Sequence, residues 1–158
     1  MRHFIPTFII ILLLASCVNS PVNLLGKVSS TKLFTTNGLF SQQHNTYRVP
    51  DADLAALSEL NSDISLAVYF GEWCGDSQRE VPIIIKSFAS NPKVKVTLYA
   101  LSLDKLEPSG KAKEKEIKFT PTMIIYDKGI EIGRIIERPK NSWVTDVVML
   151  SKLINKAK

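Results

Sequence analysis

The feature that most constrains the fold is an alternation of short apolar runs with amphipathic segments, which extends from Asp51 to Lys158. Short apolar runs bounded by turn residues indicate buried strands, whereas apolar residues at helical spacing indicate helices. Strands that alternate with helices are typical of an α/β sandwich. The sequence predicts helices over 51–60, 76–90, 107–118 and 141–158, and strands over 65–70, 94–103 and 122–136, the last range being two strands around an Asp-Lys-Gly turn.

The N-terminus carries the pattern of an export signal. A basic start at Arg2 precedes an apolar run from Phe4 to Leu14, which is too short to span a bilayer, because a spanning helix needs about 20 apolar residues. The run fits the apolar core of a secretory signal. It ends in Leu-Ala-Ser followed by Cys17, which resembles a bacterial lipobox, where the signal is cut before a cysteine that is then acylated. Ordinary signal cleavage and an uncleaved anchor are the alternatives.

The lipobox resemblance implies a lipoprotein signal peptide over 1–16 and lipidation at Cys17, since several acyl chains on one residue hold a protein stably at a membrane. Val18 follows the cysteine, whereas an aspartate there favours inner-membrane retention in the enterobacterial lipoproteins that the motif resembles. We therefore expect the bacterial cell envelope, at the outer membrane and facing the periplasm. Residues 17–50 are rich in Ser, Thr, Asn and Gln, which predicts a lipid-anchored polar tether with one short strand, followed by a folded domain over 51–158.

Charge and composition exclude several function classes. The chain has 158 residues, with 20 basic and 15 acidic residues that give a net charge of +5. This excess is too diffuse to indicate nucleic-acid binding. The two cysteines and two histidines have no spacing that fits a zinc site, so we expect no metal and no cofactor.

The stretch FGEWCGDSQREVP, residues 70–82, places a cysteine where a predicted strand gives way to a predicted helix. A helix that begins near Asp76 puts Cys74 at its N-terminus, where unpaired N–H groups and the helix dipole lower the pKa of a thiol from its usual value near 8.5. Only the thiolate form attacks disulfides. Trp73 offers an apolar contact surface, and glycines on both sides favour an exposed position. The alternative is that Cys74 is a small buried apolar residue.

The motifs EWCGDS and FTPTMIIYDKG resemble the thioredoxin family, in which W-C-x-x-C opens the first long helix. Pro82 lies eight residues after Cys74, where the family carries a helix-kinking proline. Thr120-Pro121 matches the cis-proline loop that faces the active-site cysteine, and Gly129, eight residues later, matches the glycine of the last hairpin turn. The resemblance covers roughly residues 51–158 and implies a thioredoxin-like fold, a central mixed β-sheet flanked by helices.

The chain departs from the family pattern at three linked positions. Ser77 stands where the second cysteine would be. Val68, six residues before Cys74, replaces the buried aspartate that handles the proton of the second thiol, and Ala100 replaces the lysine that pairs with it. The joint loss indicates a domain that works with one thiol or with none, and the chain closely resembles a branch of thioredoxin-like proteins with W-C-G-D-S at this site.

A single thiol predicts a monothiol thiol-disulfide oxidoreductase. A mixed disulfide at Cys74 must be resolved by an external thiol, because a serine hydroxyl does not ionise near neutral pH. Ser77 can donate a hydrogen bond to the thiolate. Asp76 can be a helix-cap acid, a charge that disfavours the thiolate, or a proton acceptor. The expected partners are protein or small-molecule disulfides and thiols, together with an external thiol reductant.

The main alternative is a non-redox module that binds peptides or proteins. Trp73, Gly75 and the Thr120-Pro121 loop would dock an extended peptide, and the backbone at Thr120 would pair with it as an added strand. Thiol peroxidases are disfavoured, because they place Thr or Ser three residues before the cysteine and Pro seven before, where this chain has Gly71 and Ala67. Monothiol glutaredoxins share C-G-x-S but lack the tryptophan and need glutathione.

Overall fold

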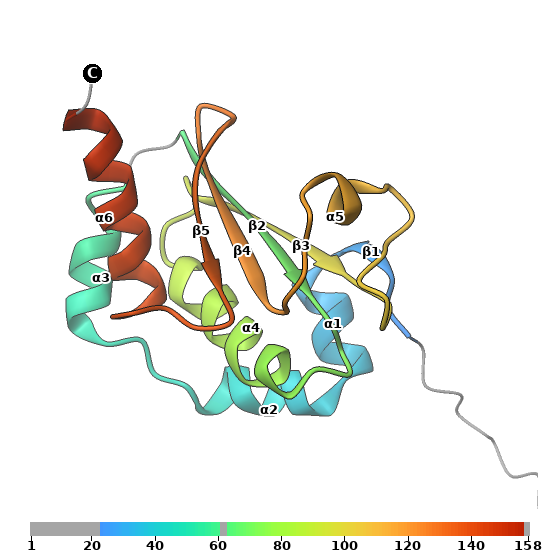
Figure 1. The fold of residues 1–158 in the computed structure, drawn as a ribbon. Coiled ribbons are helices and arrows are strands. Elements are labelled where there is room, and N and C mark those ends of the chain that lie inside the picture. The colour runs from blue at the N-terminus through green and yellow to red at the C-terminus, as the bar shows by residue number, and fades with distance from the viewer. Residues whose placement is uncertain (1–22, 61–62, 157–158) are drawn as a thin grey trace, which may run out of the picture.

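A computed structural model of the chain describes residues 23–60 and 63–156, with side chains described up to residue 153. Its centre is one mixed sheet with the strand order β1-β3-β2-β4-β5 (Figure 1). Strands β2 and β3 run parallel, and the other neighbours are antiparallel. The strands are β1 (Gly26–Val28), β2 (Ile64–Phe70), β3 (Lys95–Ala100), β4 (Thr122–Asp127) and β5 (Ile130–Ile136).

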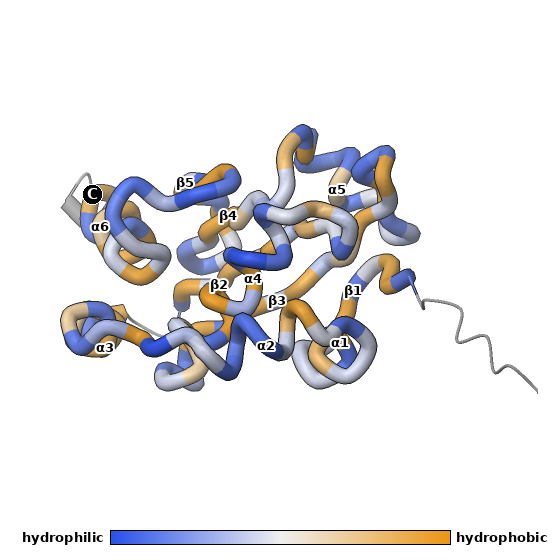
Figure 2. Tube along the Cα trace, turned by 90° about the horizontal axis from the view of Figure 1, so that it is seen from below, coloured by the Kyte–Doolittle hydropathy of each residue, from blue (hydrophilic) through white to orange (hydrophobic). Residues whose placement is uncertain are grey.

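The helices are distributed unequally over the two faces of this sheet. Alternate residues of β2, such as Leu66 and Val68, pack into a large core with helices α1 to α4 and α6. Figure 2 shows α1, α2 and α3 on one side of the strands and α5 on the other. The residues between them, such as Tyr69, face a smaller cluster that includes Ala112 of the short helix α5. The predicted α/β architecture of a mixed sheet flanked by helices is confirmed. The helices are α1 (Ser30–Thr36), α2 (Gly38–Thr46), α3 (Asp51–Leu57), α4 (Gly75–Phe88), α5 (Lys111–Glu114) and α6 (Trp143–Lys156).

The predicted short strand is present as β1, but the predicted tether is wrong for residues 24–46, which belong to the packed domain. Helix α1 begins after Ser29, whose side chain accepts a hydrogen bond from Lys32 N. Asn37 ends α1 and caps α2 through its side chain, which accepts from Leu39 N. Leu33 and Phe40 are fully buried in the main core. The proposed signal peptide and Cys17 lie outside the described residues.

The predicted helix over 107–118 is also wrong in its extent, because only α5, Lys111–Glu114, is helical. Pro108 and Gly110 precede it, and Gly110 adopts a left-handed backbone conformation as the N-cap residue. The Glu107 carboxylate accepts hydrogen bonds from Ser109 N and Ala112 N, which ties the loop to this one turn. Most of the segment is therefore a loop, and only one short turn of it is helical.

Candidate functional site

Cys74 lies at the junction that the sequence predicted, between the end of β2 and the start of α4. It is the N-cap residue of α4, and its carbonyl accepts the first helical hydrogen bond from Gln78 N at 3.0 Å. Its own N–H donates to Gly71 O at 3.1 Å, which closes the short loop after β2. The thiol is partly exposed and forms no disulfide within the described part of the chain. The alternative of a fully buried Cys74 does not fit this position.

The sheet brings the Thr120-Pro121 loop to Cys74 from 46 residues away. Strand β4 begins directly after this loop, and its Thr122 pairs with Tyr69 near the end of β2. The Thr120–Pro121 peptide bond is cis, as expected. The Cys74 thiol donates to Thr120 O with an Sγ–O distance of 3.1 Å. The structure thus places the loop against the thiol.

The surroundings of Cys74 stabilise its thiolate. Burial raises the pKa of Cys74, but hydrogen bonds from the side chains of Thr120 and Ser77 and from the backbone N–H groups of Ser77 and Asp76 outweigh it and lower the pKa below its ordinary value. The Thr120 carbonyl acts the other way, because only the protonated thiol can donate to it. The net direction agrees with the expected effect of a helix N-terminus.

Ser77 is fully buried beneath Cys74, where its hydroxyl oxygen accepts a hydrogen bond from Gly71 N at 3.3 Å. This contact fixes the oxygen and leaves the hydroxyl proton free to point at the Cys74 sulfur. The predicted role of Ser77 as a hydrogen-bond donor to the thiolate is compatible with this geometry.

Replacing Ser77 with alanine is expected to raise the pKa of Cys74, because the Ser77 hydroxyl donates a hydrogen bond that stabilises the thiolate more than the protonated thiol. The rate of iodoacetamide alkylation as a function of pH measures this, since the rate follows the thiolate fraction. The inflection should move to higher pH, and the plateau rate at high pH should change little. Ser87→Ala, a buried serine of the same helix, is the matched control and should leave the inflection unchanged. An unshifted inflection in Ser77→Ala would contradict the role assigned to this hydroxyl.

Two arginines make the Asp76 carboxylate a poor proton acceptor. Its carboxylate forms ion pairs with Arg79 and with Arg138, the latter at 3.3 Å. Hydrogen bonds from Arg79 and Arg138 lower the pKa of Asp76, which makes the carboxylate a weak base. Their positive charges also offset the negative charge that Asp76 would otherwise place beside the thiolate. The predicted role of a helix-cap acid is wrong, because Cys74 is the N-cap residue of α4 and no side chain caps it. Asp76 is instead an acid in the first turn of α4, where a negative charge stabilises the helix.

Trp73 and Gly75 flank the thiol on the surface. The indole N–H of Trp73 donates to Leu101 O at 3.2 Å, which fixes the ring. A Cβ atom at Gly71 would lie 2.5 Å from the Trp73 ring, so the ring position requires glycine there. Gly75 is exposed, and a Cβ atom built on it meets nothing within 4 Å, which leaves open space beside Cys74.

No acid or lysine occupies the positions where the family would carry its buried pair. Val68 is fully buried at the centre of β2, between Leu98 of β3 and Met123 of β4. Ala100 is equally buried and pairs with Phe70. Both side chains are part of the main apolar core. A second thiol at position 77 would therefore find neither side chain able to take up its proton.

Two residues of this region were missed by sequence reasoning. Glu72 links the active-site loop to the N-terminal segment, because its carboxylate accepts from Leu24 N at 2.6 Å and lies 3.5 Å from the Asn37 side-chain nitrogen. Arg138 reaches Asp76 across 62 residues of sequence. An acid directly before the W-C pair was a visible signal for Glu72, whereas no local pattern marks Arg138.

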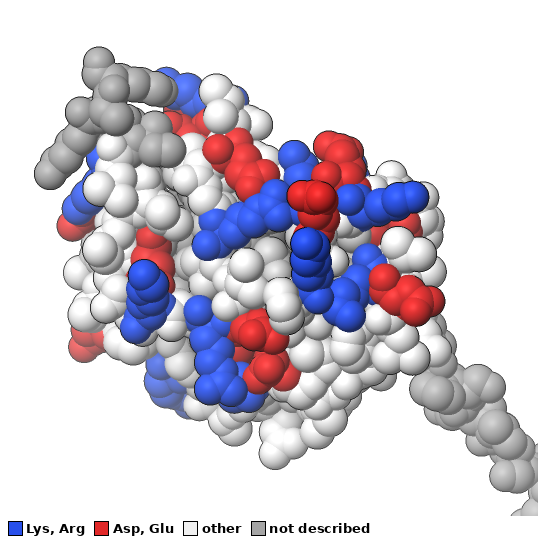
Figure 3. All heavy atoms as spheres, viewed as in Figure 1, with Lys and Arg blue, Asp and Glu red and all other residues white. Residues whose placement is uncertain are grey.

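The described residues include no metal site beside the thiol. Figure 3 shows acidic and basic side chains interspersed on the face that Figure 1 presents. Among the described residues, no group of three or more His, Cys, Asp or Glu side chains could hold a metal ion. The same residues include no helix that is both long and apolar enough to cross a membrane.

Comparisons with solved structures show the fold alone. A crystallised HIV epitope-scaffold is 15% identical, with a TM-score of 0.56, and the match covers 79% of this chain and 87% of the scaffold. A Pseudomonas aeruginosa protein of unknown function is 14% identical, with a TM-score of 0.55, and the match covers 83% of this chain and 88% of that protein.

Comparisons of sequence identify the family. A thioredoxin from Chlamydia pneumoniae is 31% identical over 91 residues, which are 58% of this chain and 85% of the relative. A family model described as thioredoxin matches residues 35–151, which contain Cys74, Ser77 and the Thr120-Pro121 loop. Because this match spans more than half of the sequence and the fold agrees with it, the chain belongs to the thioredoxin family.

Proposed function

We propose that this protein is a monothiol thiol-disulfide oxidoreductase that acts through Cys74 and is exported as a lipid-anchored protein. The observation that carries the redox part is the position of Cys74, partly exposed at the N-terminus of α4, against Thr120, with a pKa below that of an ordinary cysteine. Membership of the thioredoxin family supports chemistry on protein thiols and disulfides.

The reaction has two exchange steps. The Cys74 thiolate attacks one sulfur of a partner disulfide, a new S–S bond forms, and the other sulfur leaves with the electron pair and takes a proton from solvent. An external thiolate then attacks the mixed disulfide, which restores the Cys74 thiolate and leaves a disulfide between the partner and the external thiol. Ser77 cannot perform the second step, because its hydroxyl stays protonated.

The Thr120 carbonyl couples thiol ionisation to substrate binding. It accepts from the protonated thiol, so it loses this donor when Cys74 becomes a thiolate. A backbone carbonyl without a donor at a partly buried site is less stable. An N–H group from an extended peptide would restore the hydrogen bond, in the manner of an added strand. The reactive form of Cys74 would thus prepare the loop for a peptide.

A long-lived mixed disulfide is the experimental sign of this mechanism. Wild-type protein mixed with a model disulfide should accumulate the Cys74 adduct, which should persist until glutathione or another thiol is added, as mass spectrometry of the intact protein can follow. The variant Ser77→Cys should release the partner by forming an internal disulfide. Release should be slower than in dithiol relatives, because Val68 supplies no acid, and general acid–base assistance is typically worth about 10²–10⁴-fold. Rapid release by the wild-type protein without added thiol would contradict the proposal.

A non-redox binding module remains the second candidate, and the replacement of the buried pair by Val68 and Ala100 is the observation that favours it. Its surface would be the fixed Trp73 ring, the open space at Gly75 and the Thr120-Pro121 loop. In that case Cys74 would contribute contact area rather than chemistry.

Lipid anchoring at Cys17 would hold the site close to the membrane. The first described residue, Asn23, lines a cavity beside Trp73. Six residue steps separate it from Cys17 (23 − 17), and six extended residues span at most about 20 Å. The substrate would then be a protein at or near the same membrane.

Cys17→Ala is the variant that tests the anchor. It should move the protein from the detergent phase to the aqueous phase after phase partitioning, while Cys74→Ala should not. Retention of Cys17→Ala in the detergent phase would count against the lipobox and leave the redox proposal intact.

A further inference from the structure

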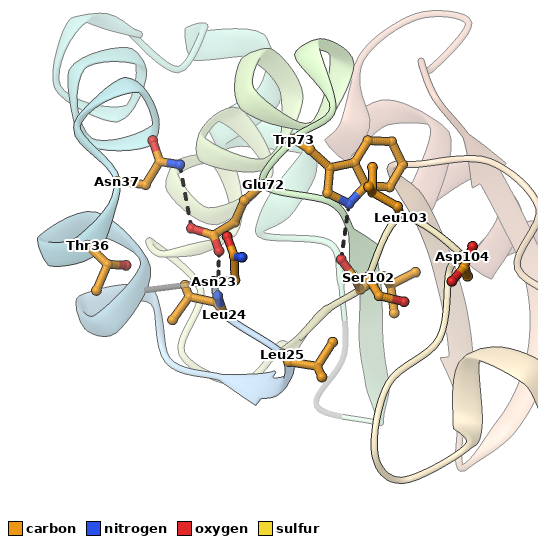
Figure 4. Close-up of a pocket in the computed structure, with 11 residues that line it drawn as sticks. Asn23, Leu24, Leu25, Thr36, Asn37, Glu72, Trp73, Ser102, Leu103 and Asp104 are labelled. Atoms are coloured by element: carbon orange, nitrogen blue, oxygen red, sulfur yellow. Dashed lines mark hydrogen bonds between the residues drawn. The ribbon is translucent and has the colours of Figure 1, made fainter. Parts of the chain in front are cut away.

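A cavity of about 650 Å³ lies beside the active-site loop, on the side of Trp73 that faces the N-terminal segment (Figure 4). Its walls are Asn23 to Leu25, the end of α1, the pair Glu72-Trp73, and the loop Leu101 to Asp104 after β3. Residues 23–25 precede the part of the chain that the thioredoxin model matches.

The walls are held rigidly by hydrogen bonds. Trp73 is fixed by its bond to Leu101 O, and Leu24 N donates to the Glu72 carboxylate at 2.6 Å. The same carboxylate lies within reach of the Asn37 side chain at the end of α1. A site whose walls are already ordered loses little conformational entropy when a ligand binds.

Three large apolar side chains are exposed around this cavity. Leu25 is 50%, Trp73 43% and Leu103 70% exposed. In Figure 4 the Leu103 side chain lies beside the Trp73 ring, and Leu25 lies on the opposite wall, on the N-terminal segment. Scattered exposed leucines are common, but a group around one cavity beside a reactive cysteine marks an interaction site. Such a lining favours an apolar side chain, because removing apolar surface from water is favourable.

The charged groups of the cavity add a second preference. Glu72 and Asp104 line it, and among the described residues neither forms an ion pair with a lysine or arginine. The nearby cation is Lys105, whose Nζ lies 5.7 Å from the centre of the Trp73 ring. Glu72 and Asp104 carry two negative charges against the one positive charge of Lys105, so the charge around the cavity is negative. The lining therefore favours a cationic over an anionic ligand.

We propose that this cavity docks a peptide segment of the redox partner, one that carries an apolar side chain beside a lysine or arginine within a few residues of the partner's reactive cysteine. This inference rests on the proposed redox function of Cys74. The cavity lies near the thiol, because Trp73 lines it and directly precedes Cys74 in the chain. An extended peptide that advances about 3.3 Å per residue reaches both positions with a few residues.

The test uses peptides whose single cysteine is joined as a disulfide to 5-thio-2-nitrobenzoate. The Cys74 thiolate attacks the peptide sulfur, the Cys74–peptide disulfide forms, and the coloured thiolate leaves with the electron pair, so absorbance follows the rate. At low peptide concentration, a peptide with Leu-Lys near its cysteine should react roughly tenfold faster than one with Leu-Glu or Ser-Lys. Asp104→Asn should remove most of the Lys-over-Glu preference, and Leu103→Ser most of the Leu-over-Ser preference.

Matched variants separate docking from general effects. Asp51→Asn and Leu153→Ser change an exposed aspartate and an exposed leucine of α3 and α6, and should leave both preferences intact. Iodoacetamide alkylation of Cys74 should be the same in all four variants. Equal rates for all peptides, or preferences that survive both Asp104→Asn and Leu103→Ser, would overturn the docking site.

A binding measurement keeps docking distinct from redox chemistry. Fluorescence anisotropy of labelled peptides in which serine replaces cysteine, measured with the Cys74→Ser protein, should show the same order of affinity. If the peptide affinities follow this order but the wild-type protein shows no disulfide exchange, the docking site would be supported and the redox function would be ruled out. If the wild-type protein exchanges disulfides but neither the affinities nor the rates differ among the peptides, the redox function would stand and the docking site would be overturned.

Discussion

Replacing Cys74 with serine is expected to abolish disulfide exchange, with a loss of at least about 10³-fold, since the nucleophile itself is removed. No other described cysteine can substitute for it. The measurement is reduction of a model disulfide in the presence of glutathione, together with capture of partners as mixed disulfides in cells. Cys74→Ala should behave in the same way, which excludes an effect of the new hydroxyl.

The two candidate functions predict opposite results for a pair of variants. For an oxidoreductase, Cys74→Ser loses all activity, whereas Trp73→Ala weakens partner capture but keeps iodoacetamide reactivity at Cys74. For a binding module, Cys74→Ser keeps partner binding and biological activity, and Trp73→Ala or a bulky residue at Thr120 removes them. Full biological activity of Cys74→Ser would end the redox proposal.

Phe40→Ala is expected to destabilise the protein by about 3–5 kcal/mol, a large fraction of the stability of a domain this size. Phe40 is fully buried, and its ring centre lies 5.7 Å from that of Phe70, the last residue of β2 before the active-site loop. Removing the ring leaves a cavity in the main core. Urea unfolding of both proteins, followed by circular dichroism, measures the difference.

Leu39→Ala is the matched control for this experiment. Leu39 is the neighbouring residue of the same helix but is 56% exposed, so its truncation should change the free energy of unfolding by less than about 0.5 kcal/mol. Equal, small effects of both substitutions would mean that residues 38–46 do not stabilise the domain and would restore the tether hypothesis for them.

The elements near the active site were predictable because their signals are local. The strand that ends at Phe70, the helix over Gly75–Phe88 and the hairpin with its turn at Gly129 all follow from apolar patterning and turn residues, and the structure has them within a few residues of the predicted bounds. Sequence patterns did not predict the N-terminal helices α1 and α2, because these helices lack a clear local signal. They have seven and nine residues, are mostly polar, and bury only Leu33 and Phe40, so no period is visible. Their caps, Ser29 and Asn37, were the only local signals.

The sequence by itself determined the chemical groups of the site. It has one thiol, Cys74, and a serine in place of the second thiol. It also has Val68 and Ala100 at the positions where the family carries an acid and a lysine. What surrounds the thiol was decided by the tertiary structure. The Thr120 carbonyl comes from 46 residues away and the Arg138 guanidinium reaches Asp76 across 62 residues, both brought there by the pairing of β2, β4 and β5. The cavity beside Trp73 likewise requires the N-terminal segment to fold back onto Glu72. Local patterns encode helices and strands through their periods, but contacts between distant segments depend on how the whole sheet assembles, so no short stretch of sequence contains them.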